Sequence, residues 1–134
     1  MAENNPKLSL IAFDADDTLW HNESLYRDTR EQFRLLLEKY GVPENFEDEV
    51  DKIEIQNLPF YGYGAMSFVL SLIEAGVSLT GGRFSTADVM ELLRLGKGML
   101  GAGIQLFDHV EETLSQVFVE YPLMLVTKGD LNHQ

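Results

Sequence analysis

The sequence contains no cysteine, and it has little positive charge, little proline and no long apolar run. Without cysteine the chain forms no disulfide and no thiolate metal site, which suits the reducing cytoplasm, where we expect the protein. The net charge of −12 at pH 7 excludes non-specific binding to nucleic acid or to an anionic membrane, because both need a basic face. No apolar run approaches the roughly 20 residues of a membrane span, and the N-terminus lacks the pattern of a signal peptide.

The residues that are present predict a folded domain. Apolar residues make up 45% of the 134 positions, with 8 Phe and 5 Tyr among them. A chain of this length and composition buries a real core as one domain, or as one domain with an insert. We expect most of the 22 acidic residues to lie on a solvated surface.

Two short apolar runs predict strands. Residues 8–13 end in a continuous apolar run, 10–13, rather than an alternating pattern, which favours a buried strand of a parallel sheet over 8–13. Three acids follow at once: Asp14, Asp16 and Asp17. The run 123–127, "LMLVT", predicts a second buried strand.

The segment between the strands has helical periodicity. We expect Ser24 to cap the first helix and Ser85 with Asp88 to cap the fourth. Proline and glycine predict where the helices end: Gly41 for the first, Pro59 for the second and Gly76 for the third. The expected helices cover 24–40, 44–57, 65–76 and 86–96, with a loop over 60–66, a glycine-rich linker over 96–103 and a further helix over 108–118. The residues expected to face the core of the first two helices are Leu25, Phe33, Leu36, Leu37, Tyr40, Phe46, Val50, Ile53 and Asn57; those of the last helix are Val110, Leu114 and Val117.

This order of elements predicts an α/β fold, with a parallel sheet interrupted by a helical insert. The helical stretch is far longer than an ordinary crossover. We therefore assign 1–22 and 101–134 to the α/β core and 23–100 to an inserted four-helix domain.

Polar residues follow both predicted strands. In an open α/β sheet, ligands bind beyond the carboxyl ends of the strands. Asp14 and Asp16 lie there after the first strand, and Thr127 and Lys128 after the second. Two carboxylates two residues apart on an extended segment leave on the same side, and their repulsion favours a cation such as Mg²⁺ between them. The alternative is a turn whose aspartates only cap the next helix, a role that suits Asp17.

The motif "FDADDTLW" resembles the first motif of the haloacid dehalogenase superfamily, and "LMLVTKGD" resembles its second. The helical insert falls where subfamily I of that family places its helical cap, and "LFDHVEETLSQV" resembles the segment that leads out of the cap. The resemblance spans nearly the whole chain. It implies a Rossmann-like parallel core with an inserted four-helix cap.

The resemblance also implies residue roles. Asp14 would be the nucleophile and a Mg²⁺ ligand. Asp16 would be the general acid and base, with a contact to the metal. Thr127 would bind the transferred phosphoryl group, and Thr18 would help to hold the turn. An acid at position 16 favours hydrolysis of a small phosphorylated metabolite through an aspartyl-phosphate, with a phosphomutase as the lesser option.

The sequence departs from the family pattern at two positions. Asp17 stands where the family often has Gly, and Lys128 stands where it often has Asn; the lysine binds the phosphate or lies in solvent. The family's third motif, a lysine, and its fourth, an acidic pair, come after the second motif and are not found before residue 134. We therefore expect an N-terminal fragment with an incomplete core and weak or no activity, in which 130–134 begins a helix.

Other residues have weaker signals. His21 is expected to be an exposed residue next to the turn, and Tyr61, Tyr63 and Arg83 are expected in cap loops, where Arg83 either meets an anionic group or lies on the surface. Two functions other than a phosphatase fit the pattern. One is a non-catalytic interaction protein, a homodimer for example, and the other is a receiver-like phospho-acceptor domain, against which the long insert argues.

Overall fold

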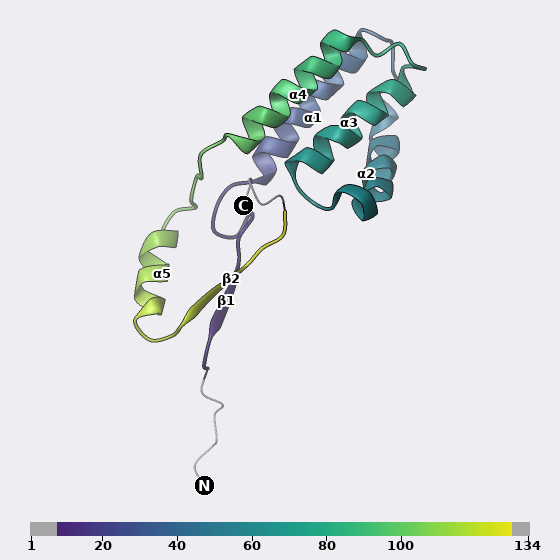
Figure 1. Cartoon of the computed structure of the whole chain (residues 1–134). Helices are drawn as coiled ribbons and strands as arrows, with labels where there is room; N and C mark the ends of the chain where they lie inside the picture. The colour runs from purple at the N-terminus through teal and green to yellow at the C-terminus, as the bar shows by residue number, and fades with distance from the viewer. Residues whose placement is uncertain (1–7, 130–134) are drawn as a thin grey trace. The chain divides into compact units, whose positions relative to one another are not determined.

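The computed structural model describes residues 8–129 (Figure 1). Its contacts divide the chain into two compact units. The strand unit runs through Glu23 and resumes over Ile104–Thr127; the helical unit is Ser24–Gly103, joined by Lys128 and Gly129. The elements in chain order are β1 (Ile11–Asp14), α1 (Glu23–Glu38), the short 3₁₀ helix η1 (Glu44–Phe46), α2 (Glu47–Tyr61), α3 (Ala65–Leu79), α4 (Thr86–Leu100), α5 (Val110–Phe118) and β2 (Leu123–Val126).

The strand unit contains the predicted parallel pair. Strand β1 pairs with β2, in a register that sets Ile11 beside Leu123 and Asp14 beside Val126. The α/β fold and the parallel sheet are therefore confirmed. Residues 8–10 lie outside the strand, so β1 begins three residues later than predicted.

The prediction that both strands are buried is wrong for the described residues. Residues of β1 alternate between half-buried and exposed, and Met124, Leu125 and Val126 of β2 are about half exposed. The predicted inward residues of α5 are only half-buried, and that helix has no fully buried residue. The described residues of this unit supply one helix and two strands, which is too little structure to cover both faces of the pair.

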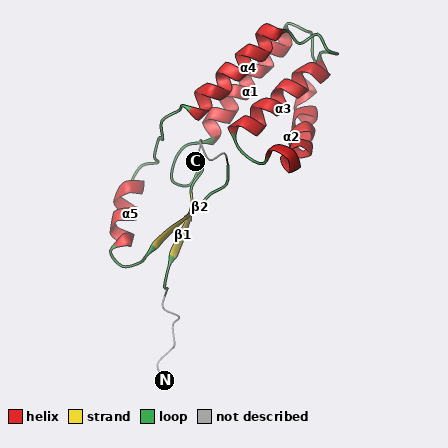
Figure 2. Cartoon of the chain, viewed as in Figure 1, coloured by secondary structure: helices red, strands yellow, loops and turns green. Residues whose placement is uncertain are grey.

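The helical unit has a well-packed core. Helices α1, α2, α3 and α4 (Figure 2) bury a common apolar cluster. The predicted core faces of the first two helices are confirmed, since each of those residues is buried or packs against the buried cluster. The largest fully buried side chains of the cluster are Phe33, Leu37, Val50, Val69, Leu72 and Leu92.

Three predicted helix ends are wrong. Helix α2 continues through Pro59 to Tyr61, because a proline removes one backbone hydrogen bond near the end without preventing the last turn. The helix ends instead at Gly62, with φ of 71° and its N–H bonded to the carbonyl of Leu58. The predicted 60–66 loop therefore shrinks to residues 62–64.

The other two errors concern glycines inside helices. Helix α3 passes through Gly76, and α4 passes through Gly96 to Leu100, so the predicted linker over 96–103 is half helical. A Cβ on Gly76 would lie 2.9 Å from the ring of Phe84, and one on Gly96 would lie 2.8 Å from Val69. These glycines allow close packing rather than ending the helices.

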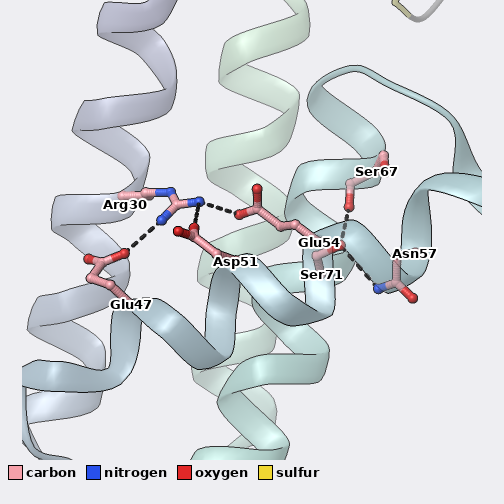
Figure 3. Close-up of polar contacts among 7 residues, drawn as sticks. All are labelled: Arg30, Glu47, Asp51, Glu54, Asn57, Ser67 and Ser71. Carbon is pink, nitrogen blue, oxygen red and sulfur yellow. Dashed lines mark hydrogen bonds and ion pairs between the residues drawn. The ribbon is translucent and has the colours of Figure 1, made fainter.

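Polar contacts join α1 to α2 at the surface of the helical unit (Figure 3). The guanidinium of Arg30 contacts Glu47 at 2.6 Å, Asp51 at 2.8 Å and Glu54 at 2.7 Å. Burial acts to lower the pKa of Arg30, but these hydrogen bonds and charges raise it above its ordinary value. The charge of the partly buried Arg30 is thus paired with carboxylates of α2.

The buried side chain of Asn57 is the polar member of the α2 core face. Its amide donates to the hydroxyl of Ser71 at 3.1 Å, and that hydroxyl donates to the carbonyl of Ser67 at 2.9 Å (Figure 3). The amide also contacts Glu74. Because a buried polar group is costly only when it lacks a partner, Asn57 is tolerated in this core.

No helix within residues 8–129 is long and apolar enough to cross a membrane. The helix predicted over 130–134 lies outside the described residues.

Candidate active site

The acidic turn follows β1 and is closed by its own backbone. The N–H groups of Thr18 and Leu19 donate to the carbonyl of Ala15, and the N–H of Asp17 donates to the carbonyl of Trp20. Ala15 and Leu19 are buried, whereas Asp14 and Asp17 are exposed. The apolar residues of the motif therefore anchor the turn, and two of its acids face the solvent.

The segment 105–107 holds the turn through backbone hydrogen bonds. The N–H of His21 donates to the carbonyl of Gln105 at 2.9 Å, and the N–H of Phe107 donates to the carbonyl of Leu19 at 3.0 Å. The His21 and Phe107 rings also contact each other, with centroids 3.9 Å apart. His21 is exposed, as predicted, and it helps to fix the turn to the segment before α5.

Asp14 is the last residue of β1, rather than the first of the turn. Its Oδ2 accepts a hydrogen bond from the hydroxyl of Thr18 at 2.8 Å. This hydrogen bond agrees with the role predicted for Thr18, which is to hold the turn. The bond involves one oxygen of Asp14 and restricts how the carboxylate rotates.

Asp16 is half-buried and is held by an aromatic side chain. The indole N–H of Trp20 donates to its Oδ1 at 3.0 Å. Sequence reasoning missed this contact, because a spacing of four residues is read as a contact only within a helix. The pair also forms a short β-bridge through its backbone.

Asp17 fits the alternative interpretation of the turn, in which an aspartate caps the next helix. Its φ of 54° is left-handed, a conformation that Asp tolerates better than most residues. Its carboxylate accepts the N–H of Asn22 at 2.9 Å and that of Glu23 at 2.9 and 3.0 Å. Asp17 therefore caps α1, and the predicted cap, Ser24, lies inside the helix.

The predicted phosphate-binding residues follow β2. Because Val126 pairs with Asp14 in a parallel register, Thr127 follows at the same end of the sheet as the acidic turn. Lys128 belongs to the helical unit by its contacts, and its ammonium lies 4.1 Å from the centroid of the Tyr63 ring. The phosphate role of Lys128 stays a prediction.

The cap-loop residue Arg83 has partners of its own. Its Nε donates to the carbonyl of Thr80 at 2.9 Å, and its guanidinium lies 5.9 Å from the centroid of the Tyr40 ring. The Thr80 carbonyl is at the end of α3, where a helix leaves carbonyl groups without helical partners. These contacts explain the arginine without an anionic ligand.

The donor set fits magnesium in part. Over residues 8–129, no group of three or more His, Cys, Asp or Glu side chains could hold a metal ion. Mg²⁺ is often bound by one or two carboxylates, with water and phosphate oxygens completing its shell. Asp14 and Asp16 are the two carboxylates that the sequence predicts for such a site, and their role as metal ligands stays a prediction.

Solved structures of other proteins are similar to the structure of this chain. It is similar to a haloacid dehalogenase-like family hydrolase from Xanthomonas campestris, with 33% identity and a TM-score of 0.88 over 95% of this chain and 53% of that one. A predicted phosphoglycolate phosphatase from Haemophilus somnus 129pt is 22% identical, with a TM-score of 0.49 over 94% of this chain and 54% of that one. The chain thus spans about half the length of each. No family model and no curated protein matches it.

A parallel strand pair that ends in an acidic turn, with a helical insert between the strands, defines an α/β core with an inserted helical domain. The first of these two structures extends that likeness over nearly the whole chain. This likeness bears out the resemblance of the chain's two motifs to the haloacid dehalogenase superfamily.

Proposed function

We propose that this chain carries the nucleophile and the general acid of a magnesium-dependent phosphohydrolase that acts on a small phosphorylated metabolite. One observation supports this most directly. The parallel register of β1 and β2 brings Asp14 and Thr127 to the same end of the sheet, where ligands bind in this class of fold. The family supports the reaction class, hydrolysis, and the substrate is proposed from the residues.

The proposed reaction has two steps. In the first, a carboxylate oxygen of Asp14 attacks phosphorus, the bond from phosphorus to the ester oxygen breaks, and Asp16 gives its proton to that departing oxygen. In the second, Asp16 takes a proton from water, which attacks phosphorus and releases phosphate and the carboxylate of Asp14. The hydroxyl of Thr127 would donate to a phosphoryl oxygen in both steps. A bound Mg²⁺ would offset the negative charge of the phosphoryl group.

We further propose that the 134-residue chain is weakly active or inactive by itself. Phosphoryl transfer depends on positioning and on neutralising charge, and the described residues offer two carboxylates rather than a group of three or more. Turnover by the pure chain at an ordinary phosphatase rate would contradict this part of the proposal.

The experiment incubates the chain with Mg²⁺ and a panel of small phosphomonoesters and measures both released phosphate and the intact mass. We expect a small population that carries one phosphoryl group. Asp14→Asn should abolish it. Asp16→Asn should slow its formation, because the departing oxygen lacks its acid, and should slow its hydrolysis, because the water lacks its base, so the phosphoryl group that does form persists longer. Asp48→Asn makes the same charge change at an exposed position of α2 and should behave as the native chain. Equal phosphorylation of the Asp14→Asn chain would refute the proposed nucleophile.

A non-catalytic interaction protein is the second candidate. The observation that favours it is the half-exposed apolar surface of Met124, Leu125 and Val126 on β2. Sedimentation measurements distinguish the two candidates when they are made beside the mass experiment. A stable dimer that is never phosphorylated would favour the interaction protein, and a phosphorylated monomer would exclude it.

A further inference from the structure

A groove of about 230 Å³ lies between α1 and α4 of the helical unit. Its floor is apolar, because Leu25, Leu95 and Met99 line it and pack in or against the buried cluster of that unit. The other residues that line the α1–α4 groove are Asp28, Thr29, Gln32, Arg94 and Gly98. An apolar cavity of about 150 Å³ already holds a benzene molecule, so this groove has room for a small ligand.

The side chain of Thr29 is the buried polar group of this groove. It is 4% exposed, and within residues 8–129 its hydroxyl makes no hydrogen bond. Two other buried helical hydroxyls are paired: that of Ser71 donates to the carbonyl of Ser67 at 2.9 Å, and that of Thr80 donates to the carbonyl of Gly76 at 2.8 Å. A buried hydroxyl without a partner is destabilising. A ligand that pairs with Thr29 would therefore gain a hydrogen bond without breaking one within the protein.

The charged groups that line the α1–α4 groove already have partners. The guanidinium of Arg94 donates to the carboxylate of Glu91, from Nε at 2.8 Å and from Nη2 at 2.5 Å. The carboxylate of Asp28 lies 3.8 Å from Nε of Arg27. An ionic ligand would have to compete with these pairs, so the groove favours a neutral one.

We propose that the α1–α4 groove binds a small, neutral, mostly apolar molecule with one hydroxyl group, such as a phenol or a simple alcohol, and that this hydroxyl pairs with that of Thr29. A hydroxyl group both donates and accepts hydrogen bonds, so the pair forms in either direction. The apolar part of the ligand covers Leu25, Leu95 and Met99. This site lies within the helical unit alone and does not depend on the proposed function of Asp14 and Asp16.

Phenol and toluene are matched probes of this site, because they have nearly the same size and differ in one hydroxyl group. The measurement is an NMR titration of the whole chain with each probe, which follows the methyl groups of Leu25, Thr29, Leu95 and Met99. We expect both probes to shift these methyl resonances, and we expect nuclear Overhauser contacts between the phenol ring and the methyl groups of Leu95 and Met99.

The variant Thr29→Val keeps the shape of the side chain and removes its hydroxyl. It should weaken the binding of phenol by about 3- to 10-fold and leave the binding of toluene nearly unchanged. Thr113→Val makes the same change at an exposed position of α5, outside the groove, and should alter neither affinity. If water alone pairs with Thr29, phenol should lose no more affinity than toluene.

The inference would be overturned if phenol left the groove methyl resonances of the native chain unshifted, a result that needs no variant. It would also be overturned if Thr29→Val weakened the two probes equally or weakened neither. None of these measurements involves phosphoryl transfer, so their outcome is separate from that of the phosphorylation experiment.

Discussion

Val69 on α3 occupies the space that a side chain at Gly96 on α4 would need. A Cβ built on Gly96 would lie 2.8 Å from Cγ2 of Val69, whereas one built on Gly98, two residues further along α4, would have no atom within 4 Å. The two glycines thus have the same helical backbone and opposite surroundings.

Substitution of each glycine by alanine should therefore have opposite effects. We expect Gly96→Ala to lower the free energy of unfolding by about 1–3 kcal/mol, because α3 and α4 must move apart. We expect Gly98→Ala to raise it by about 0.5–1 kcal/mol, because alanine loses less backbone entropy in a helix. Urea unfolding followed by circular dichroism measures both, and equal effects would contradict the packing role of Gly96.

The sequence predicted the helical insert well, and two of its three wrong helix ends share one cause. Apolar periodicity identified the core faces of the first two helices, and the predicted capping pair is present, since the N–H of Asp88 donates to the hydroxyl of Ser85 at 3.1 Å. Gly76 and Gly96 were interpreted as helix ends because glycine is a local signal for a stop. Their actual role is set by Phe84 and Val69, which a local pattern does not bring together.

The candidate site was predicted in outline only. The positions of Asp14 and Thr127 after parallel strands followed from the strand pattern, and the left-handed turn at Asp17 followed from the known tolerance of aspartate. The bond from Trp20 to Asp16 did not, because it crosses an irregular turn with no repeating spacing. The exposure of β2 was also missed, since an apolar run does not say how many strands lie beside it.

Asp88 predicts a pH dependence of stability. Burial acts to raise its pKa, but hydrogen bonds from Lys39, Tyr40 and Ser85 outweigh burial and lower the pKa to about 2, from an ordinary 3.8. A folded-state pKa below the unfolded one stabilises the protein above the unfolded value, and this contribution is lost as the pH falls through the folded value. We expect a loss of about 2 kcal/mol between roughly pH 5 and pH 2 from this group.

Two variants test this assignment. Asp88→Asn should lower stability at neutral pH and flatten its dependence on acid, because the amide does not ionise. Asp48→Asn removes an exposed carboxylate of α2 and should leave the slope of the free energy of unfolding against pH nearly unchanged. Urea unfolding across the acid range measures both, and an Asp88→Asn chain with the native slope would rule out Asp88 as its source.

Arg30 should matter more than Arg34, although both belong to α1 and both contact acids. Arg30 joins α1 to three carboxylates of α2, including the half-buried Glu54, whose pKa is raised by burial. Arg34 contacts Glu31 and Glu38 within its own helix. We expect Arg30→Met to cost about 1–2 kcal/mol and Arg34→Met to cost clearly less, because Arg34 is exposed to solvent screening, with the difference reduced in high salt. Equal losses in thermal unfolding would show that the contact between helices adds nothing.

Asp17 combines two effects that a pair of variants can separate. Its backbone is left-handed, and its carboxylate caps the first N–H groups of α1. Glycine tolerates the backbone but lacks the cap, so Asp17→Gly should cost only the cap, about 1 kcal/mol. Alanine lacks the cap and strains the backbone, so Asp17→Ala should cost about 1–2 kcal/mol more.

Asp17→Asn keeps an oxygen acceptor and tolerates the conformation, and it should remain closest to the native chain in urea unfolding. If the glycine and alanine chains were equally stable, the left-handed turn would contribute no strain, and the aspartate at this position would be explained by the cap alone.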